Sequence, residues 1–271
     1  MRTIAIMNQK GGVGKTTTSV NLSAALAAKG KRVLLVDLDP QSHASLHLGL
    51  TFEKEFPSVY DVLVNDEALS DVRRQVSENL WLVPAHLDLA AADFELASVL
   101  GREKILADKI AEDSMTFDYL IIDCPPSLGV LTLNALVAVE EVIIPLQPHF
   151  LALHGLSKLL ETIVLVSKRL NPRLRVSGVA LCLYDARTTL ANDVKTDVQN
   201  FFNANEGRPE SWKHVKVFDT NIRRNIRLAE APSYGKSIFD YDPKSNGAED
   251  YRALCEEILQ MEENASPSDQ D

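Results

Sequence analysis

The sequence predicts an α/β fold in which a doubly wound, mostly parallel sheet is flanked by helices. Two observations indicate this class. Short apolar runs alternate with longer stretches of helical periodicity, and short connections join them. In addition, a glycine-rich segment at residues 10–17 links the first apolar run to the first helical stretch. Strand, loop and helix in that order are typical of the first unit of such a sheet.

The length and composition indicate one domain. With 271 residues and 45% hydrophobic content, the chain can build a single substantial core but not two typical large ones. We expect one domain over residues 1–261 and an acidic, disordered tail over 262–271.

The predicted elements follow one another along the chain. Strands are expected at residues 4–7, 33–36, 80–83, 117–123, 142–145 and 176–183. Helices are expected at residues 18–28, 60–64, 151–170 and 247–261. The remainder of 42–80 is interpreted as surface loops and short helices. Residues 87–110 carry apolar side chains at helical spacing, which favours a packing surface.

The glycine-rich segment has the composition of a phosphate-binding loop. It reads Lys10-Gly11-Gly12-Val13-Gly14-Lys15-Thr16-Thr17. Its three glycines let successive N–H groups converge on an anion, and the following helix directs its positive end to the same place. Lys15 would add a charge near the β and γ phosphates, and the Thr16 hydroxyl is placed to hold Mg²⁺. The alternative is a glycine-rich turn that binds nothing.

One residue of this loop departs from the standard pattern. That pattern places glycine where this chain has Gln9, and it does not require a lysine at position 10. Lys10 is either a solvated loop lysine or a second cation that reaches a phosphate bound to another subunit.

The loop resembles the deviant Walker A motif of the ParA/MinD group of P-loop ATPases. This resemblance implies the fold of a P-loop NTPase with ATP and Mg²⁺ as its cofactors. Within that group the extra lysine, here Lys10, contacts the nucleotide of the partner subunit. The resemblance therefore implies an ATP-dependent homodimer, with the whole segment from Lys10 to Thr17 contributing to the nucleotide site and Lys10 and Lys15 acting in catalysis.

Three acids lie at the ends of apolar runs and are expected beside the loop, because ligands gather at the carboxyl ends of parallel strands. Asp39 lies in the segment Asp-Leu-Asp-Pro-Gln, and a carboxylate there can orient the attacking water; the ParA pattern places its catalytic acid at this position. Asp37 is equally well explained as a turn or capping carboxylate. Asp123 ends the run that precedes Cys-Pro-Pro, as in a Walker B pattern, and is assigned to the Mg²⁺ shell.

Two groups of arginines are candidates for binding nucleic acid. Arg187 follows the predicted strand at 176–183, and the alternatives to a DNA contact are an ion pair with Asp185 or a helix start. Arg223, Arg224 and Arg227 are expected on one or two neighbouring faces of a helix, where they would contact phosphates without reading sequence. The alternative is a solvated helix face.

The ParA resemblance extends to these segments. Tyr-Asp-Ala-Arg-Thr at 184–188 resembles the ParA segment that contains a DNA-binding arginine, here Arg187. Residues 222–233 resemble a second such segment, which implies that Arg227 binds DNA and that Pro232 lies against the adenine. Compared with short family members, residues 203–213 form an extra polar stretch, interpreted as a surface excursion.

The net charge of −10 does not exclude DNA binding, because most of the negative charge is concentrated near one end of the chain. Residues 249–271 contain eight acids and one arginine. No apolar run is long enough to cross a membrane, and no leader pattern is present. MinD-like members end in a basic membrane-binding helix, whereas this end is acidic. We therefore expect a cytoplasmic, nucleoid-associated protein. The three cysteines and six histidines suggest no metal site, and Cys124 and Cys182 are expected to be buried.

Together these features predict an ATPase of the ParA/Soj type that drives chromosome or plasmid segregation. ATP would close the dimer, the dimer would bind non-specific DNA through Arg187, Arg224 and Arg227, and hydrolysis would reset it. Turnover is expected to be slow until a ParB-type partner stimulates it. Two alternatives are a related ATPase that positions a protein cargo on the nucleoid and a nucleotide-switched regulator of replication or transcription.

Overall fold

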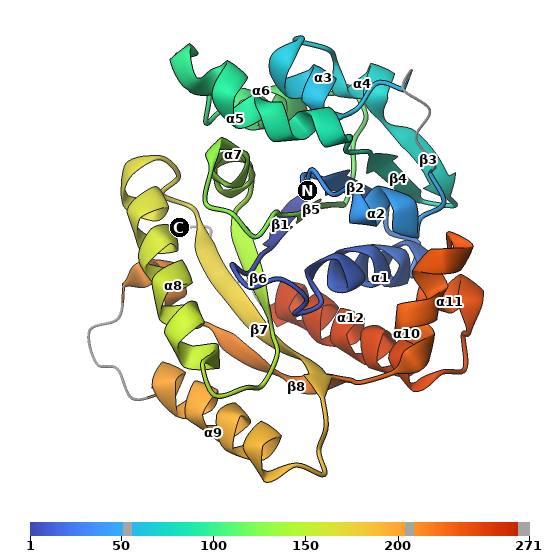
Figure 1. Cartoon of the computed structure of the whole chain (residues 1–271), viewed down its shortest axis with the longest axis vertical. Helices are drawn as coiled ribbons and strands as arrows, with labels where there is room; N and C mark the ends of the chain where they lie inside the picture. The colour runs from blue at the N-terminus through green and yellow to red at the C-terminus, as the bar shows by residue number, and fades with distance from the viewer. Residues whose placement is uncertain (51–55, 204–208, 265–271) are drawn as a thin grey trace.

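The computed structural model describes residues 1–50, 56–203 and 209–264, which are organised around an eight-stranded sheet (Figure 1). The strand order is β3-β4-β2-β5-β1-β6-β7-β8. All neighbouring strands pair in parallel except β3 and β4, which are antiparallel. The predicted class, a doubly wound and mostly parallel sheet, is confirmed.

The six predicted strands are all present, with ends that differ from the prediction by at most two residues. They are β1 (Arg2–Ile6), β2 (Val33–Asp37), β4 (Leu80–Val83), β5 (Tyr119–Asp123), β6 (Glu141–Leu146) and β7 (Arg175–Tyr184). Each is buried on both faces, which is why it reads as a continuous apolar run.

The two outermost strands were not predicted. They are β3 (Arg74–Ser77) and β8 (Lys216–Arg223). In β8 only Phe218 and Ile222 are buried, and β3 is exposed at every second residue. An edge strand of this kind has too few apolar residues to produce a recognisable pattern.

Helices cover both faces of the sheet (Figure 1). One face is covered by α1 (Lys15–Ala28), α2 (His43–His47), α10 (Ile226–Glu230), α11 (Ile238–Tyr241) and α12 (Asn246–Asn264). The other face is covered by α3 (Val59–Val64), α4 (Leu69–Val72), α5 (Ala92–Glu95), α6 (Ile105–Glu112), α7 (Val130–Ala138), α8 (Ala152–Arg169) and α9 (Thr189–Asn203). Four short 3₁₀ turns are η1 (Leu87–Ala91), η2 (Leu96–Ser98), η3 (Glu210–Trp212) and η4 (Ala231–Tyr234).

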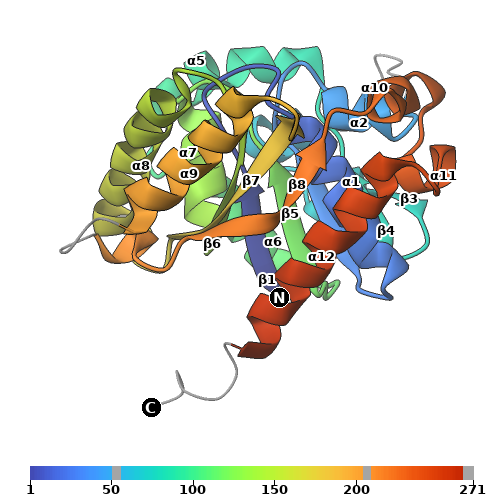
Figure 2. The ribbon, with the colours of Figure 1, turned by 90° about the horizontal axis from the view of Figure 1, so that it is seen from below.

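Alternate residues of the central strand explain the two layers. Ile4 and Ile6 of β1 pack with α1 and α12, whereas Ala5 and Met7 pack with the helices of the opposite face. Figure 2 shows α12 beside α1 across the first of these faces.

Two helix predictions need correction. Residues 87–110 do not form one helical surface: they break into η1, α5, η2 and the start of α6, with Gly101 at a φ of 73° in the turn between them. The last helix does not end at 261 but continues to Asn264, so the acidic tail does not begin at 262. Residues 265–271, the rest of the predicted tail, and 204–208 of the predicted polar excursion lie outside the described residues.

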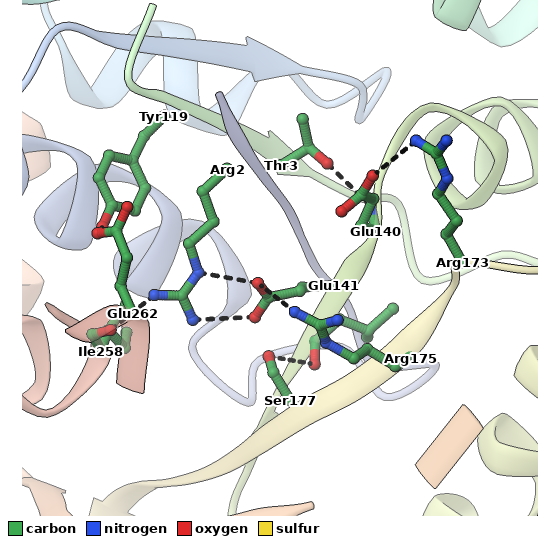
Figure 3. Close-up of polar contacts among 11 residues, drawn as sticks. Arg2, Thr3, Tyr119, Glu140, Glu141, Arg173, Arg175, Ser177, Ile258 and Glu262 are labelled. Atoms are coloured by element: carbon green, nitrogen blue, oxygen red, sulfur yellow. Dashed lines mark hydrogen bonds and ion pairs between the residues drawn. The ribbon is translucent and has the colours of Figure 1, made fainter. Parts of the chain in front are cut away.

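The amino end of the sheet is closed by a polar cluster that holds the C-terminal part of α12 (Figure 3). The Arg2 guanidinium donates to the Ile258 carbonyl oxygen at 2.6 Å, and the Tyr119 hydroxyl donates to Glu262 at 2.5 Å. The opposite, carboxyl end of the sheet carries the predicted site.

Candidate nucleotide-binding site

The predicted phosphate loop connects β1 to α1 at the carboxyl end of the sheet. Gly12 and Gly14 have φ angles of 72° and 96°, a backbone conformation that other residues rarely adopt. A Cβ atom built on Gly11 or Gly12 would meet nothing within 4 Å, so the space beside the loop is open. Because α1 begins at Lys15, its unpaired N–H groups are presented at the same place. The geometry is that of an anion-binding cradle.

Lys15 is held inside this loop, with 7% of its surface exposed. Its Nζ donates to the carbonyl oxygen of Lys10 at 3.4 Å. A neutral carbonyl at this distance satisfies a buried ammonium group poorly, so Lys15 can turn to an anion. Val13 is buried beneath the loop, and Thr16 and Thr17 are half-buried at the start of α1.

Asp37 and Asp123 are brought together by the register of β2 and β5, in which they are direct partners. Both carboxylates are fully buried. Asp37 accepts hydrogen bonds from the backbone N–H and the hydroxyl of Ser45, and from the N–H of Asp39. Burial raises the pKa of Asp37 to about 6 and that of Asp123 to about 8. Repulsion from Asp37 raises the pKa of Asp123 further, and repulsion from Asp39 raises the pKa of both groups.

Asp123 has one oxygen without a partner. Its Oδ1 accepts a hydrogen bond from the Ser19 hydroxyl at 2.9 Å, while its buried Oδ2 has no hydrogen-bond partner among the described residues. A buried and unpaired carboxylate oxygen is costly unless a cation binds it. Carboxylate and hydroxyl oxygens are suitable ligands for Mg²⁺, which usually takes few protein ligands and completes its shell with phosphate and water. Asp123 and the nearby Thr16 therefore fit a magnesium ion.

Asp37 is better explained as a structural carboxylate than as a metal ligand. Both of its oxygens accept hydrogen bonds from the chain, and these bonds fix the turn after β2 and the start of α2. The turn and capping interpretation of Asp37 agrees with these contacts.

Asp39 lies two residues beyond the end of β2 and is largely buried. Its Oδ1 accepts a hydrogen bond from the N–H of Gln41 at 3.0 Å, which forms a local turn. This places Asp39 at the same end of the sheet as the phosphate loop. Its role with the attacking water stays a prediction.

The candidate DNA-binding arginines come from two neighbouring strands and one helix. Arg187 follows β7 and Arg224 follows β8, and the N–H of Arg224 donates to the carbonyl oxygen of Tyr184 at 3.2 Å. Arg187 forms a two-bond ion pair with Asp185, whose pKa this pair lowers to about 2. Arg227 lies on α10, where it contacts Glu230 and Asp242.

The expectation that Arg223, Arg224 and Arg227 share a helix is wrong. Arg223 is the last residue of β8, and its guanidinium contacts Asp250 and Glu249 of α12. These acids belong to the C-terminal region, 26 and 27 residues further along the chain. The charge of Arg223 is therefore compensated within the chain, and Arg223 fastens β8 to α12.

Pro232 lies in η4, close to the segment that follows α2. Gly49 and Gly235 both have positive φ angles, and a Cβ on Gly235 would lie 2.7 Å from the Cα of Gly49. Next to this contact His47 is buried, and burial lowers its pKa to about 4. The backbones of the two segments therefore touch, which fixes η4 beside the segment that follows α2. The contact of Pro232 with adenine stays a prediction.

Three polar residues of the site were not identified from the sequence. Ser19 holds Asp123, Ser45 holds Asp37, and Asn8 bonds to the phosphate loop. Ser19 follows Lys15 by one helical turn, and this spacing is the one signal that could have indicated it. The partners of Ser45 and Asn8 depend on tertiary contacts.

The cysteines contribute packing. Cys124 and Cys182 are buried as predicted, and burial raises the pKa of Cys182 to about 12. A Cβ on Gly14 would lie 3.4 Å from the Cβ of Cys182, so the Cys182 side chain packs against the phosphate loop at Gly14. Across residues 1–50, 56–203 and 209–264, no three His, Cys, Asp or Glu side chains form a metal-binding group by themselves.

Within these described ranges, no helix is both long enough and apolar enough to cross a membrane.

Comparison with known proteins identifies the family. Residues 1–176 match the family model described as an AAA domain, AAA_31. The chain is 49% identical to the sporulation initiation inhibitor protein Soj of Bacillus subtilis, over 94% of this chain and 97% of that protein. It is 43% identical to the chromosome partitioning protein ParA of Myxococcus xanthus, over 98% and 90%.

A solved structure extends the likeness to the whole fold. The crystal structure of cobyrinic acid a,c-diamide synthase from Mycobacterium smegmatis, with bound ADP and magnesium, has a TM-score of 0.82 and 40% sequence identity. The match covers 98% of this chain and 96% of that one. With the glycine loop, the unpaired Asp123 oxygen and these relatives, the chain belongs to the Soj/ParA family of P-loop ATPases.

Proposed function

We propose that this protein is a DNA-binding ATPase that drives chromosome or plasmid segregation through a cycle of ATP-dependent dimerisation. The binding of nucleotide is supported by one observation, the open glycine loop with the unpaired Asp123 oxygen on the adjacent strand. A relative at 43% identity is named for chromosome partitioning, which supports the cellular role.

The residues of the site would divide the work of ATP hydrolysis. The loop amides and Lys15 would hold the phosphates, and Thr16 and Asp123 would hold Mg²⁺, which neutralises charge on the phosphate oxygens when bound. Asp39 would orient the attacking water and accept its proton. Ser19 would keep the Asp123 carboxylate in one orientation through its bond to Oδ1.

Dimerisation is supported by the surface around the loop. Phe150 and Leu151 follow β6, and Leu128 follows β5, the two strands that flank β1. Phe94 is near Leu128, because the Asp93 carboxylate accepts the N–H of Val130. All four of these apolar side chains are exposed. An apolar rim around a nucleotide site is suited to pack against a second subunit, whose nucleotide Lys10 would reach.

DNA binding would use Arg187, Arg224 and Arg227 of both subunits. Phosphate contacts add in log affinity, so doubling the number of arginines would make the dimer bind where the monomer hardly does. In this proposal the protein acts in the cytoplasm on the nucleoid, and a ParB-type partner stimulates an otherwise slow hydrolysis.

The decisive experiment measures binding to an arbitrary DNA duplex with ATP, with ADP and without nucleotide, at a stated salt concentration. Wild type would be compared with Arg227→Ala and Lys10→Ala. We expect binding that requires ATP, is lost in Lys10→Ala, which cannot close the dimer, and is weakened in Arg227→Ala, which lacks one phosphate contact per subunit. Wild-type protein that binds DNA in no nucleotide state would refute the segregation role. ATP-dependent binding that survives in Lys10→Ala would refute the contact between subunits.

A further inference from the structure

Asn8 is a buried polar residue in the segment between β1 and the phosphate loop, with 7% of its surface exposed. Both ends of its side-chain amide are bonded. Its Nδ2 donates to the carbonyl oxygen of Pro145 on β6 at 2.8 Å, and its Oδ1 accepts the N–H of Lys10 at 3.0 Å. A carbonyl can only accept and an N–H can only donate, so the orientation of the amide follows from its two partners.

The backbone of Lys10 is thereby held on both sides. Its N–H is bonded to Asn8, and its carbonyl oxygen lies 3.4 Å from the Nζ of Lys15. Its side chain is exposed. If Lys15 turns toward a phosphate, its contact with the Lys10 carbonyl is lost, and the bond from Asn8 stays as the contact that ties residue 10 to the sheet.

We propose that Asn8 is a positioning residue for Lys10: it fixes the backbone from which the Lys10 side chain extends toward the second subunit. This role rests on the proposed function, because it requires that Lys10 act across a dimer. Asn8 does not touch nucleotide in this scheme. It acts by linking Lys10 to Pro145 of β6, a buried strand that lies between β1 and β7 in the sheet.

The proposal predicts which measurements change. Asn8→Ala should weaken ATP-dependent dimerisation and lower turnover up to about tenfold, the effect of one or two lost hydrogen bonds. The affinity of the monomer for ATP should stay within about twofold, because the loop glycines and Lys15 remain. Asn8→Ser should recover part of the loss, since a serine hydroxyl can accept the same N–H two residues on but lacks the amide nitrogen that bonds to Pro145.

The chain offers a matched control in Asn171. Its Nδ2 donates to the Val139 carbonyl oxygen at 2.6 Å, and its Oδ1 accepts the N–H of Arg173 at 3.2 Å. Asn171 thus shares with Asn8 the bond to the N–H two residues on and a link to a distant carbonyl oxygen, and its Nδ2 also donates to the carbonyl oxygens of Leu136 at 2.9 Å and Val137 at 3.4 Å. It lies before β7, at the amino end of the sheet. Asn171→Ala should lower stability at least as much as Asn8→Ala and leave dimerisation with ATP unchanged.

The test is a double-mutant cycle on the full chain with wild type, Asn8→Ala, Lys10→Ala and the double variant. Dimerisation with ATP would be measured by analytical ultracentrifugation, ATP affinity by a fluorescent analogue, and turnover by phosphate release. If Asn8 acts through Lys10, the double variant should be no weaker than Lys10→Ala alone. Additive losses in the double variant, or Asn8→Ser no better than Asn8→Ala, would overturn the role of Asn8.

The outcomes also separate this inference from the proposed function. If wild type dimerises with ATP, Lys10→Ala does not, and Asn8→Ala behaves as wild type, only the role of Asn8 is refuted. If wild type does not dimerise, or Lys10→Ala dimerises normally, the dimer and the positioning role are refuted together.

Discussion

Buried carboxylates lie at both ends of the sheet, and they differ in whether an arginine is paired with them. At the amino end, the Glu141 oxygens accept two bonds of 2.9 Å from Arg2, and Arg175 lies 3.3 Å away (Figure 3). Burial alone would raise the pKa of Glu141, but the bonds and charge of Arg2 lower it below its usual value.

At the carboxyl end, Asp37 and Asp123 are partners in the strand register, no arginine of the described residues forms an ion pair with either of them, and their pKa values are raised. The difference indicates what each end is for. Where the carboxylate serves stability, the chain supplies the cation itself. At the carboxyl end, Asp123, which we propose as a magnesium ligand, keeps one oxygen without a hydrogen-bond partner among the described residues, whereas the chain itself provides hydrogen bonds to both oxygens of Asp37. Changes at the carboxyl end should therefore affect turnover, and changes at the amino end should affect stability.

The largest expected effect is at Asp39. Asp39→Ala should lower ATP turnover about 10²–10⁴-fold, the usual contribution of a general base. Nucleotide affinity should change little, because the loop and Lys15 are intact. Phosphate release and fluorescent-nucleotide binding would be measured on the same preparation. Equal losses in affinity and turnover would instead assign Asp39 to nucleotide binding.

The next effect is on stability at the amino end. Glu141→Gln leaves the largely buried Arg2 guanidinium without its carboxylate, and we expect the free energy of unfolding to fall by about 3 kcal/mol. The neighbouring residue supplies the control, since Glu140 pairs with Arg173 on an exposed surface. Glu140→Gln should cost less than about 1 kcal/mol. Denaturant unfolding measures the free energy of unfolding of both variants. ATP turnover per folded molecule should equal that of wild type in each, and a different turnover would contradict the division between the two ends.

The free energy of unfolding should change with pH in opposite directions for the carboxylates at the two ends of the sheet. With raised pKa values, folded Asp37 and Asp123 bind more protons than in the unfolded chain, so without Mg²⁺ the free energy of unfolding falls as pH rises above about 4 toward neutrality. Glu141 acts oppositely: its stabilisation is present above its usual pKa and is lost as pH falls through its lowered value.

Asp123→Asn should therefore make the unfolding free energy less dependent on pH. Denaturant unfolding at pH 5 and pH 8 in a chelator would compare it with wild type. Buried His47, with its pKa lowered to about 4, stabilises the fold increasingly as pH rises to about 6.5. This contribution is common to both proteins and cancels in the comparison. A variant with the same slope as wild type would show that Asp123 is ionised in both states.

The smallest expected effect concerns the arginines. Arg227→Ala should reduce the slope of log affinity against log salt by about 1 per subunit, uniformly across DNA sequences. Asp185→Asn should act in reverse and strengthen DNA binding, because it frees Arg187 from its ion pair and removes a negative charge. A salt titration by fluorescence anisotropy measures both. A sequence-dependent loss in Arg227→Ala would indicate base contacts.

What the sequence predicted correctly was local or strongly patterned. The phosphate loop is recognisable because left-handed backbone at positions 12 and 14 requires glycine at those positions themselves. The central strands are recognisable because both of their faces are buried. The position of Asp123 at the carboxyl end of the sheet was predicted because this residue ends such a strand.

What the sequence did not predict depends on partners distant in the chain. From the sequence alone, Arg223 is predicted to belong to a basic helix. Its partner Asp250 is 27 residues away, and only the fold brings the two side chains together. Asn8 is an ordinary loop residue until Pro145 is brought within 2.8 Å of it. The edge strand β8 has few buried residues and takes its form from pairing with β7.

The contact between Gly49 and Gly235 has a consequence for how this sequence can vary during evolution. Each glycine occupies a backbone conformation that disfavours side chains, and each leaves too little space for a side chain on the other. A substitution at either position would separate the two segments whichever residue replaced it. We therefore expect related sequences to keep both glycines or to change both together, with insertions in one segment matched by changes in the other.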